Sequence, residues 1–421
     1  MVGAGGREHA LAWRLARDPS VERVLAAPGT PGIARGASCH DVAAGDTDGL
    51  LALVERERVD LTVVGPEGPL VAGLADELSA RGQAVFGPSA EAARLEGSKS
   101  WAKDLCDRHG IPAARSRSAA TMSEALGALD EFGSPYVVKV DGLAAGKGVV
   151  VTEERDEAVR ALELALVRRE FGDAGSHVVL EEHLSGREVS AFALADGSTA
   201  LPLGFAEDFK RVDDGDAGPN TGGMGAYSPV PGVGEAEVEQ LLESVHRPVL
   251  AELARRDSPF TGLLYAGLML TDDGPRVLEF NCRFGDPETQ SVLPRLDGDL
   301  LPLLWGAATG DLDGQAALGA GAAVTVVLAG GEYPERGDSG TPIEGVEEAE
   351  ATGALVFHAG TARHDDRLVT NGGRVLAVTA TGEDVGAARA TAYEAVNRIS
   401  FSGMRFRRDI GLAAAEQHVR T

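Results

Sequence analysis

The stretch RVLEFNCRFGDPETQ, residues 276–290, is the most specific part of this sequence. Side chains alternate along a β-strand, so Glu279, Asn281 and Arg283 are expected on one face. One carboxylate and one amide oxygen suit Mg²⁺ when phosphates and water complete its shell, and Arg283 can neutralise charge on a transferring phosphoryl group. A solvated edge strand would also alternate, but it would rarely combine these residue types beside GDPE. The three side chains on the other face are predicted to lie in the core: Leu278, Phe280 and Cys282.

A glycine-rich loop, GLAAGKG at residues 142–148, lies between two runs of β-forming residues. Its backbone amides can approach phosphates, although it is not a Walker A loop, because three residues separate its first two glycines and glycine follows the lysine. A plain hairpin turn is the alternative for this loop. Lys139 ends the preceding strand among apolar residues, where an unpaired ammonium would be costly, and this favours a bound phosphate.

Lysine is scarce, and its distribution is uneven. All five lysines lie between residues 99 and 210, whereas arginine occurs throughout the chain. A compact ammonium acts as a point charge on phosphate in a way that the planar guanidinium does not, so these positions are candidates for phosphate contacts; chance clustering is the alternative.

The length of 421 residues corresponds to about three domains. Strands alternate with helices in the first part, which predicts a parallel sheet with ligand-binding glycine loops at its strand ends. The middle part reads as mixed α+β and includes a Gly-, Pro- and Asp-rich segment, residues 204–231, that we interpret as a long functional loop. The last part reads as a small α+β domain.

The net charge of −26, from 65 acidic and 39 basic residues, is dispersed along the chain. This pattern predicts an acidic, solvated surface adapted to a salty cytoplasm, and argues against nucleic acid binding. No apolar run reaches the ~20 residues of a membrane helix, and the three cysteines form no CxxC pair. We therefore expect a cytoplasmic chain with reduced thiols.

Seven segments together carry a family resemblance: GAGGREHAL, VGPEGPLVAG, LEGSKSWAKD, KVDGLAAGKGVVV, GPNTGGMGAYSP, LEFNCRFGDPETQ and VTNGGRVLAVTA. Along essentially its whole length the chain resembles the glycinamide ribonucleotide synthetases of the ATP-grasp superfamily. The resemblance implies an α/β protein with an N-terminal Rossmann-like, parallel-sheet domain (1–98), a central ATP-grasp α+β domain (99–318, lid subdomain about 117–187) and a small C-terminal α+β domain (319–421).

The same resemblance implies an activity. It is the ATP-dependent ligation of glycine to 5-phosphoribosylamine through glycyl phosphate, which yields glycinamide ribonucleotide, ADP and phosphate in purine biosynthesis. ATP is then a substrate, and Mg²⁺ or Mn²⁺ the metal. Only small-molecule partners are expected, with no nucleic acid and no membrane, and the chain is expected to be a monomer.

Site residues follow from the resemblance position by position. The ATP-binding positions are Lys103, Lys139, Gly146, Lys147, Gly148, Glu181, Glu182, Leu184 and Glu188. The metal ligands are Glu279 and Asn281, and the catalytic positions are Arg283, Lys139 and Lys210. The positions expected to hold glycine, its acyl phosphate or phosphoribosylamine are Gly5, Gly6, Arg7, Glu67, Asn220, Thr221, Gly222, Gly223 and Asp286.

The chain departs from the family pattern at three places. Only Met1 and Val2 precede the first glycine turn, so either the first strand is shortened or the start is misassigned; we expect a start placed too late. Phe209 stands where the family commonly has histidine, which removes any role for that histidine. Val140 replaces a usual alanine, a change that packing should tolerate.

Rival functions explain fewer features. A dinucleotide-dependent oxidoreductase needs glycine or alanine where Glu8 stands and an acidic residue at the end of the second strand, where the chain has AAPG. A carboxylase-type ATP-grasp subunit shares the lysines and the metal pair but leaves GPNTGGMGAYSP unexplained. A non-catalytic nucleotide-binding module would not need Arg283 beside the metal pair.

Overall fold

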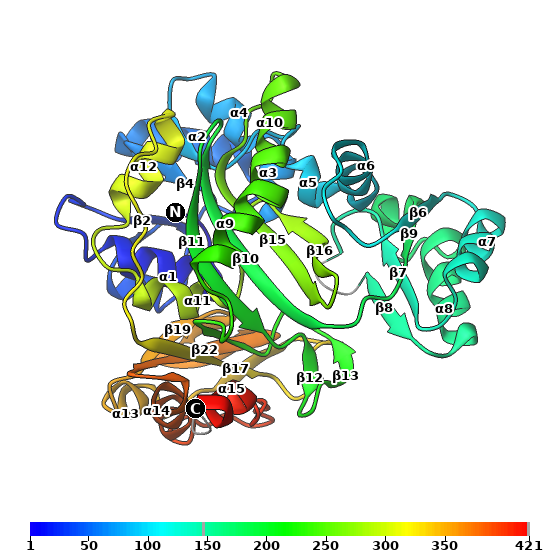
Figure 1. Ribbon diagram of the computed structural model, residues 1–421. Coiled ribbons are helices and arrows are strands. Elements are labelled where there is room, and N and C mark those ends of the chain that lie inside the picture. Colours follow the sequence, from blue (N-terminus) through cyan, green and yellow to red (C-terminus); the bar gives the residue numbers. More distant parts are fainter. Residues whose placement is uncertain (145–147, 419–421) are drawn as a thin grey trace.

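The protein is described by a computed structural model over residues 1–144 and 148–418 (Figure 1). Its first domain contains parallel strands, as predicted. β1 pairs with β2 and β2 with β3, β4 pairs with β5, and a parallel bridge from Val2 to Val64 joins the two groups. The strands are β1 (Val2–Gly3), β2 (Leu25–Pro28), β3 (Ser38–Cys39), β4 (Leu61–Val63) and β5 (Ala84–Phe86). The accompanying helices are α1 (Gly6–Leu15), α2 (Thr47–Glu57), α3 (Glu67–Val71), α4 (Leu74–Ser79) and α5 (Arg94–Gly97).

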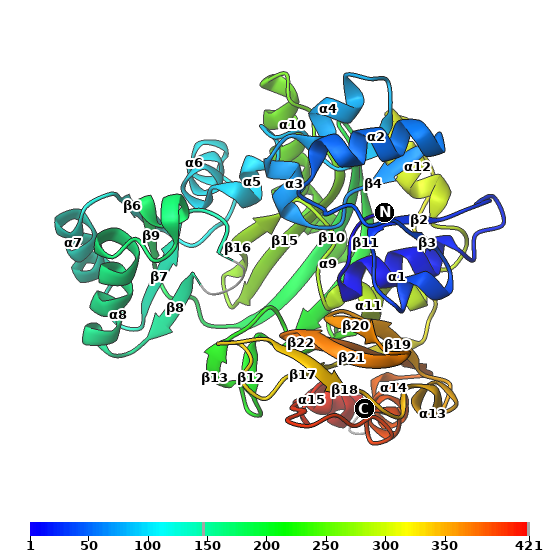
Figure 2. The same ribbon diagram turned by 180° about the vertical axis from the view of Figure 1, so that it is seen from behind.

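A small four-stranded unit follows α6 (Lys99–His109) and projects from the rest of the molecule in both views (Figures 1 and 2). Its strand order is β6-β9-β7-β8. The unit has its own apolar core, in which Leu129, Leu162 and Leu180 are buried. It consists of β6 (Ser116–Ala119), α7 (Met122–Phe132), β7 (Tyr136–Val140), β8 (Val149–Thr152), α8 (Arg155–Leu162) and β9 (Val178–Glu181).

An eight-stranded antiparallel sheet forms the centre of the molecule and continues into the C-terminal domain. Its order is β16-β15-β10-β11-β14-β17-β22-β19. The strands are β10 (Arg187–Asp196), β11 (Ala200–Asp208), β14 (Gly225–Ser228), β15 (Thr261–Thr271), β16 (Gly274–Asn281), β17 (Ala322–Ala329), β19 (Leu355–His358) and β22 (Arg374–Gly382). Every residue of β17 is buried, which explains its unbroken apolar sequence AAVTVVLA.

Helices and a small sheet complete the fold. α10 (Arg247–Arg255), α11 (Glu288–Val292), α12 (Leu301–Thr309), α13 (Val346–Glu350), α14 (Val385–Val396) and α15 (Leu412–His418) are the principal remaining helices, with α9 (Glu235–Leu241) preceding α10. The C-terminal domain also contains a sheet of β18 (Asp338–Pro342), β21 (Arg367–Gly372) and β20 (Thr361–His364). The predicted fold class is thus confirmed. Within the described residues, no helix combines the length and apolar character needed to cross a membrane.

The prediction of a long loop over residues 204–231 is wrong. This segment holds the end of β11, the hairpin β12 (Arg211–Asp213) and β13 (Ala217–Asn220), and the buried strand β14. β14 lies between β11 and β17 and hydrogen-bonds to both, so it connects the central and C-terminal parts of the sheet. Its short glycine-containing sequence resembles a loop, and only its two partner strands make it a strand.

The simple alternation predicted for residues 276–283 is also interrupted. β16 has a β-bulge against β15, since Gly267 faces Glu279 whereas the next residue, Leu268, faces Val277. Val277 is therefore buried, with 1 % of its surface exposed, and Leu278 is only half-buried, which corrects the prediction that Leu278 lies in the core. Beyond the bulge the prediction is confirmed, because Phe280 and Cys282 are buried.

Because of the bulge, Phe280 and Leu278 should contribute differently to the free energy of unfolding. We expect Phe280→Ala to lower the free energy of unfolding by about 3–5 kcal/mol, because it leaves a cavity in the core. Leu278→Ala should cost less than about 2 kcal/mol, since that side chain is only half-buried. Urea unfolding of both variants measures this, and equal losses would contradict the bulge.

Candidate active site

β16 and the loop that follows it, residues 276–290, contact most of the predicted site residues. β16 is an edge strand of the central sheet, on the side of the molecule from which the four-stranded unit projects (Figure 1). Groups from all three domains reach this segment, and each is held by a charged contact described below.

Two buried lysines share one carboxylate. Lys103 on α6 and Lys139 on β7 lie 3.2 and 3.0 Å from the two carboxylate oxygens of Glu181, at the end of β9. Lys139 also donates to the carbonyl of Leu278 at 3.2 Å, at the bulge of β16. Burial lowers the pKa of Lys103, although Glu181 opposes this shift. The buried Lys139 is therefore paired within the protein, but two ammonium groups against one carboxylate leave an excess of positive charge that suits an anion.

A third lysine joins two predicted site acids. Lys210, in the two-residue connection between β11 and β12, contacts Glu188 of β10 and lies 3.2 Å from Glu279 of β16. Burial opposes the charge on Lys210, but Glu188, Glu279 and Asp208 outweigh it and raise its pKa. Lys210 in turn, with smaller effects of Lys139 and Lys99, lowers the pKa of Glu279 to about 2. Glu279 is thus ionised at neutral pH.

Arg283 connects the central domain with the first domain. Its guanidinium lies 2.7 Å from Glu96 and 3.2 Å from Glu67, and it donates to Asn281 Oδ1 at 3.2 Å. Burial would lower the pKa of Arg283, but Glu96 and Glu67 outweigh burial and raise it. Burial would raise the pKa of Glu67, yet Arg283 and Arg7 lower it to about 2. Arg283 is thus a permanently charged group held between two domains.

Several of the predicted substrate residues lie around Asp286. The Arg7 guanidinium donates to the carbonyl of Phe284 at 3.0 Å, and Arg374 of the C-terminal domain lies 3.5 Å from the Asp286 carboxylate. Arg374 also donates to the carbonyls of Asp286 and Gly222. Gly6 allows the close approach of the first domain, because a Cβ there would lie 2.6 Å from Gln290 Nε2.

The remaining predicted ATP-binding residues are less fully described. Gly146 and Lys147 lie outside the described residues, and Gly148 is the residue before β8. The Glu182 side chain accepts from Arg115 at 2.7 Å and Arg276 at 3.1 Å, on the outer side of β9. Leu184, half-buried, follows in the connection to β10. In the GPNTGG segment, the Asn220 side chain donates to the carbonyl of Val149 on the four-stranded unit at 3.4 Å.

The oxygen donors of Glu279 and Asn281 suit a divalent cation. Gly267 opposite Glu279 leaves room for that side chain, because a Cβ at Gly267 would lie 3.1 Å from Glu279 Cγ. Among residues 1–144 and 148–418, no group of three His, Cys, Asp or Glu side chains is arranged to hold a metal by itself. The donor set therefore fits Mg²⁺ only if phosphates and water complete the shell.

Two further charged residues of this site, Glu96 and Arg374, are not among the residues predicted from the motifs. Glu96 is buried and accepts from Arg283 and from the backbone amide of Cys282 at 2.9 Å, and Arg374 holds the Asp286 loop. Both stand within segments quoted for the resemblance, LEGSKSWAKD and VTNGGRVLAVTA. An isolated acid or arginine in such a segment does not reveal its partner, which lies about 190 or 90 residues away in the chain.

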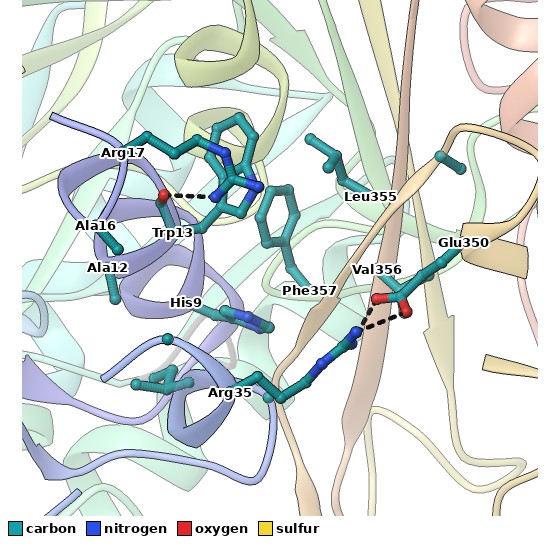
Figure 3. A pocket seen from close by; sticks show the side chains of 14 residues that line it. His9, Ala12, Trp13, Ala16, Arg17, Arg35, Glu350, Leu355, Val356 and Phe357 are labelled. Carbon is teal, nitrogen blue, oxygen red and sulfur yellow. Dashed lines mark hydrogen bonds and ion pairs between the residues drawn. The ribbon is translucent and has the colours of Figure 1, made fainter. Parts of the chain in front are cut away.

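A separate cavity of about 340 Å³ lies where α1 and the turn at residues 32–36 meet the C-terminal domain (Figure 3). The side chains of Trp13 and Phe357 line it, and Arg35 spans the domain junction to Glu350 in a two-pronged ion pair with contacts of 2.5 and 2.9 Å. None of the predicted site residues lines this cavity. It belongs to the contact between the first and last domains and is distinct from the site around β16.

Comparison with known proteins agrees with this arrangement. The sequence matches three family profiles in order: "Phosphoribosylglycinamide synthetase, N domain" over residues 1–96, "ATP-grasp (A) domain" of the same enzyme over 97–289, and its "C domain" over 323–413. The chain belongs to the phosphoribosylglycinamide synthetase family. This confirms the resemblance inferred from the motifs.

Family relatives match over nearly their full length. A phosphoribosylamine–glycine ligase of Streptomyces coelicolor is 51 % identical over 420 residues, which cover 99 % of both chains. One of Mesorhizobium japonicum is 49 % identical, covering 98 % of this chain and 97 % of the relative. The crystal structure of the Thermotoga maritima phosphoribosylamine–glycine ligase superposes with a TM-score of 0.86 at 36 % identity, covering 97 % of this chain and 98 % of that one.

Carboxylase structures share only the fold with this chain. The biotin carboxylase domain of Hydrogenobacter thermophilus 2-oxoglutarate carboxylase has a TM-score of 0.73 and 15 % identity, over 96 % of this chain and 90 % of that one. Such a likeness shows a common ATP-grasp architecture and carries no activity across.

The depressed pKa of Glu279 has a consequence for stability. Its pKa falls from 4.5 to about 2 on folding, so the ionised side chain adds stability that is fully present above about pH 4.5 and is lost as the pH falls toward 2. We expect the difference in unfolding free energy between the parent and Glu279→Gln to shrink from about pH 6 to about pH 3. Urea unfolding across that range measures it. The exposed Glu348→Gln is the control, and a constant difference for Glu279→Gln would contradict the depressed pKa.

Proposed function

We propose that this protein ligates glycine to 5-phosphoribosylamine at the expense of ATP, with glycinamide ribonucleotide, ADP and phosphate as products. The observation that carries the proposal is the full-length similarity to phosphoribosylamine–glycine ligases at 49 % and 51 % identity. The convergence of charged groups from three domains on residues 276–290 supports it, because a ligase must bring three substrates to one place.

The proposed first step is attack of a glycine carboxylate oxygen on the γ-phosphorus of ATP, which forms glycyl phosphate and releases ADP. Lys103 and Lys139 carry the excess positive charge that would hold the phosphates, and Arg283 would stabilise charge that develops on the transferred group. Glu279 and Asn281 would hold Mg²⁺ or Mn²⁺, which would neutralise phosphate charge when bound.

The proposed second step joins the two substrates. The amine of phosphoribosylamine attacks the carbonyl carbon of glycyl phosphate, phosphate leaves, and the nitrogen loses a proton. The loops around Asp286 would hold both partners, with Lys210 and the GPNTGG segment on the glycine side and Gly5, Gly6, Arg7 and Glu67 on the sugar side. Exclusion of water by the four-stranded unit would protect the acyl phosphate from hydrolysis.

We also propose the domain limits 1–98, 99–318 and 319–421 and a cytoplasmic monomer. The dispersed net charge of −26 supports an acidic surface adapted to salt. A place in purine biosynthesis follows from the product.

The direct experiment is a steady-state assay of ADP release. We expect turnover only when ATP, a divalent metal, glycine and phosphoribosylamine are all present. Release that needs bicarbonate and biotin instead of the two ligase substrates would replace this proposal with the carboxylase alternative.

Replacement of Lys139 tests the phosphate role. Lys139→Met should slow turnover by roughly 100-fold, because it removes one preorganised positive charge. Lys139→Arg should also impair turnover, since a planar fork cannot occupy the position of the ammonium. Near-normal turnover of either variant, measured on protein with parent-like thermal melting, would reject the role.

Titration with Mg²⁺ tests the metal pair separately. Glu279→Gln keeps the shape of the side chain and removes its charge, so we expect turnover to need a much higher Mg²⁺ concentration. Phe280→Ala, on the opposite face, should keep the parental Mg²⁺ dependence per folded molecule. If Glu279→Gln shows the same Mg²⁺ dependence of turnover as the parent protein, Glu279 is not a metal ligand.

A further inference from the structure

Arg407 is a buried charge that none of the site contacts described above involves, and it contacts both neighbours of Lys210. Only 1 % of Arg407 is exposed. Its guanidinium carbon lies 4.8 Å from the ring centroid of Phe209, and Nη1 donates to the carbonyl of Arg211 at 3.2 Å. The residues before and after Lys210 are thus held by one side chain.

The guanidinium of Arg407 uses its whole fork. Nε and Nη2 donate to the two carboxylate oxygens of Asp409 at 2.8 and 2.6 Å, and Nη1 donates to Asp216 at 2.6 Å. Asp216 lies in the turn of the β12–β13 hairpin, so Arg407 also contacts the far end of the segment that begins at Lys210. Lysine, with a single nitrogen, cannot make these contacts together.

Further contacts attach the hairpin to residues 405–409, which we call the C-terminal clasp. Arg405 pairs with Asp213 at 2.6 Å, the amide of Arg408 donates to Asp214 at 2.7 Å, and the amide of Gly215 donates to Asp409 at 2.8 Å. The acidic sequence RVDDGDAG of the hairpin is thereby matched to a basic segment of the last domain.

The clasp is itself anchored on a helix. The hydroxyl of Tyr393, on α14, donates to the carbonyl of Arg407 at 2.7 Å and accepts from the amide of Ile410 at 3.2 Å. α14 packs on the central sheet through buried residues such as Ala388 and Ala392. The clasp therefore has a fixed position relative to β16.

The base of the hairpin transmits that position to the site. The amide and the hydroxyl of Thr221 both donate to the carbonyl of Lys210, at 2.7 and 2.8 Å, so the two ends of the hairpin are joined. The Lys210 ammonium then extends to Glu188 and Glu279. A displacement of the hairpin would move this ammonium relative to β16.

We propose that Arg407 is a positioning residue for Lys210: the C-terminal clasp sets where the Lys210 ammonium meets glycine and its acyl phosphate. The inference rests on the proposed function for the identity of the substrate. Phe209, which stands where the family commonly has histidine, provides the apolar ring on which the Arg407 guanidinium lies.

The test compares Michaelis constants for the separate substrates. Arg407→Lys should raise the KM for glycine by about tenfold or more and change the KM for ATP by less than about twofold, because Lys103 and Lys139 lie on other elements. Asp216→Asn, at an exposed partner, should act in the same direction with a smaller effect. Arg408→Gln is the matched control, since the exposed Arg408 side chain is not part of the fork and its amide remains.

Limited trypsin digestion supplies a readout independent of catalysis. We expect cleavage after Lys210 or Arg211 to accelerate in Arg407→Lys and Asp216→Asn, but not in Arg408→Gln. Equal changes in the KM values for glycine and ATP in Arg407→Lys would overturn the positioning role. KM values and trypsin cleavage rates equal to those of the parent protein would also overturn it. If Arg407→Lys does not fold, Asp216→Asn decides by the same criteria. If the parent protein shows no ligase turnover, the proposed function is refuted. The positioning of Lys210 is then tested by trypsin cleavage alone, and cleavage rates that are unchanged in Arg407→Lys and Asp216→Asn would overturn it.

Discussion

Burial of positive charge against carboxylates from distant elements is the constraint on which the interior of this protein depends. Lys103, Lys139 and Arg407 are buried, Lys210 and Arg283 are partly buried, and an unpaired cation in such surroundings would be destabilising. Each pairs with a carboxylate on another segment of the fold, and Arg407 pairs in addition with Asp409 of its own segment. These pairs hold the domains in one arrangement, and they also leave positive charge in excess where two lysines share Glu181.

β16 brings several of these buried charges together at the candidate site. At the bulge the carbonyl of Leu278 accepts from Lys139, and beyond it the alternation resumes, with Glu279 beside Lys210. Two residues further, Asn281 contacts Arg283, whose other partners belong to the first domain. A short strand and its loop thus contact, in sequence order, the proposed nucleotide side, the proposed metal pair and the proposed substrate loops.

The continuous sheet explains why the C-terminal domain takes part. β14 is hydrogen-bonded to β11 on one side and β17 on the other, so the last domain is built on the same sheet as the candidate site around β16. Arg374 and the C-terminal clasp reach the GPNTGG segment and the hairpin from that base. A domain with no predicted site residue therefore shapes the substrate side of the site.

The amino-acid sequence was enough to predict the family, the α/β class and the residue types of the candidate site, because motifs such as FNCRFGDPETQ combine rare polar residues with strand spacing. It also predicted that Phe280 and Cys282 lie in the core, since period-two alternation is local. The bulge at Leu278, the strand character of residues 225–228, and the partners Glu96, Arg374 and Arg407 could be seen only in the folded chain. Each of these depends on contacts between residues far apart in the chain, and neither propensity nor spacing along a single segment contains that information.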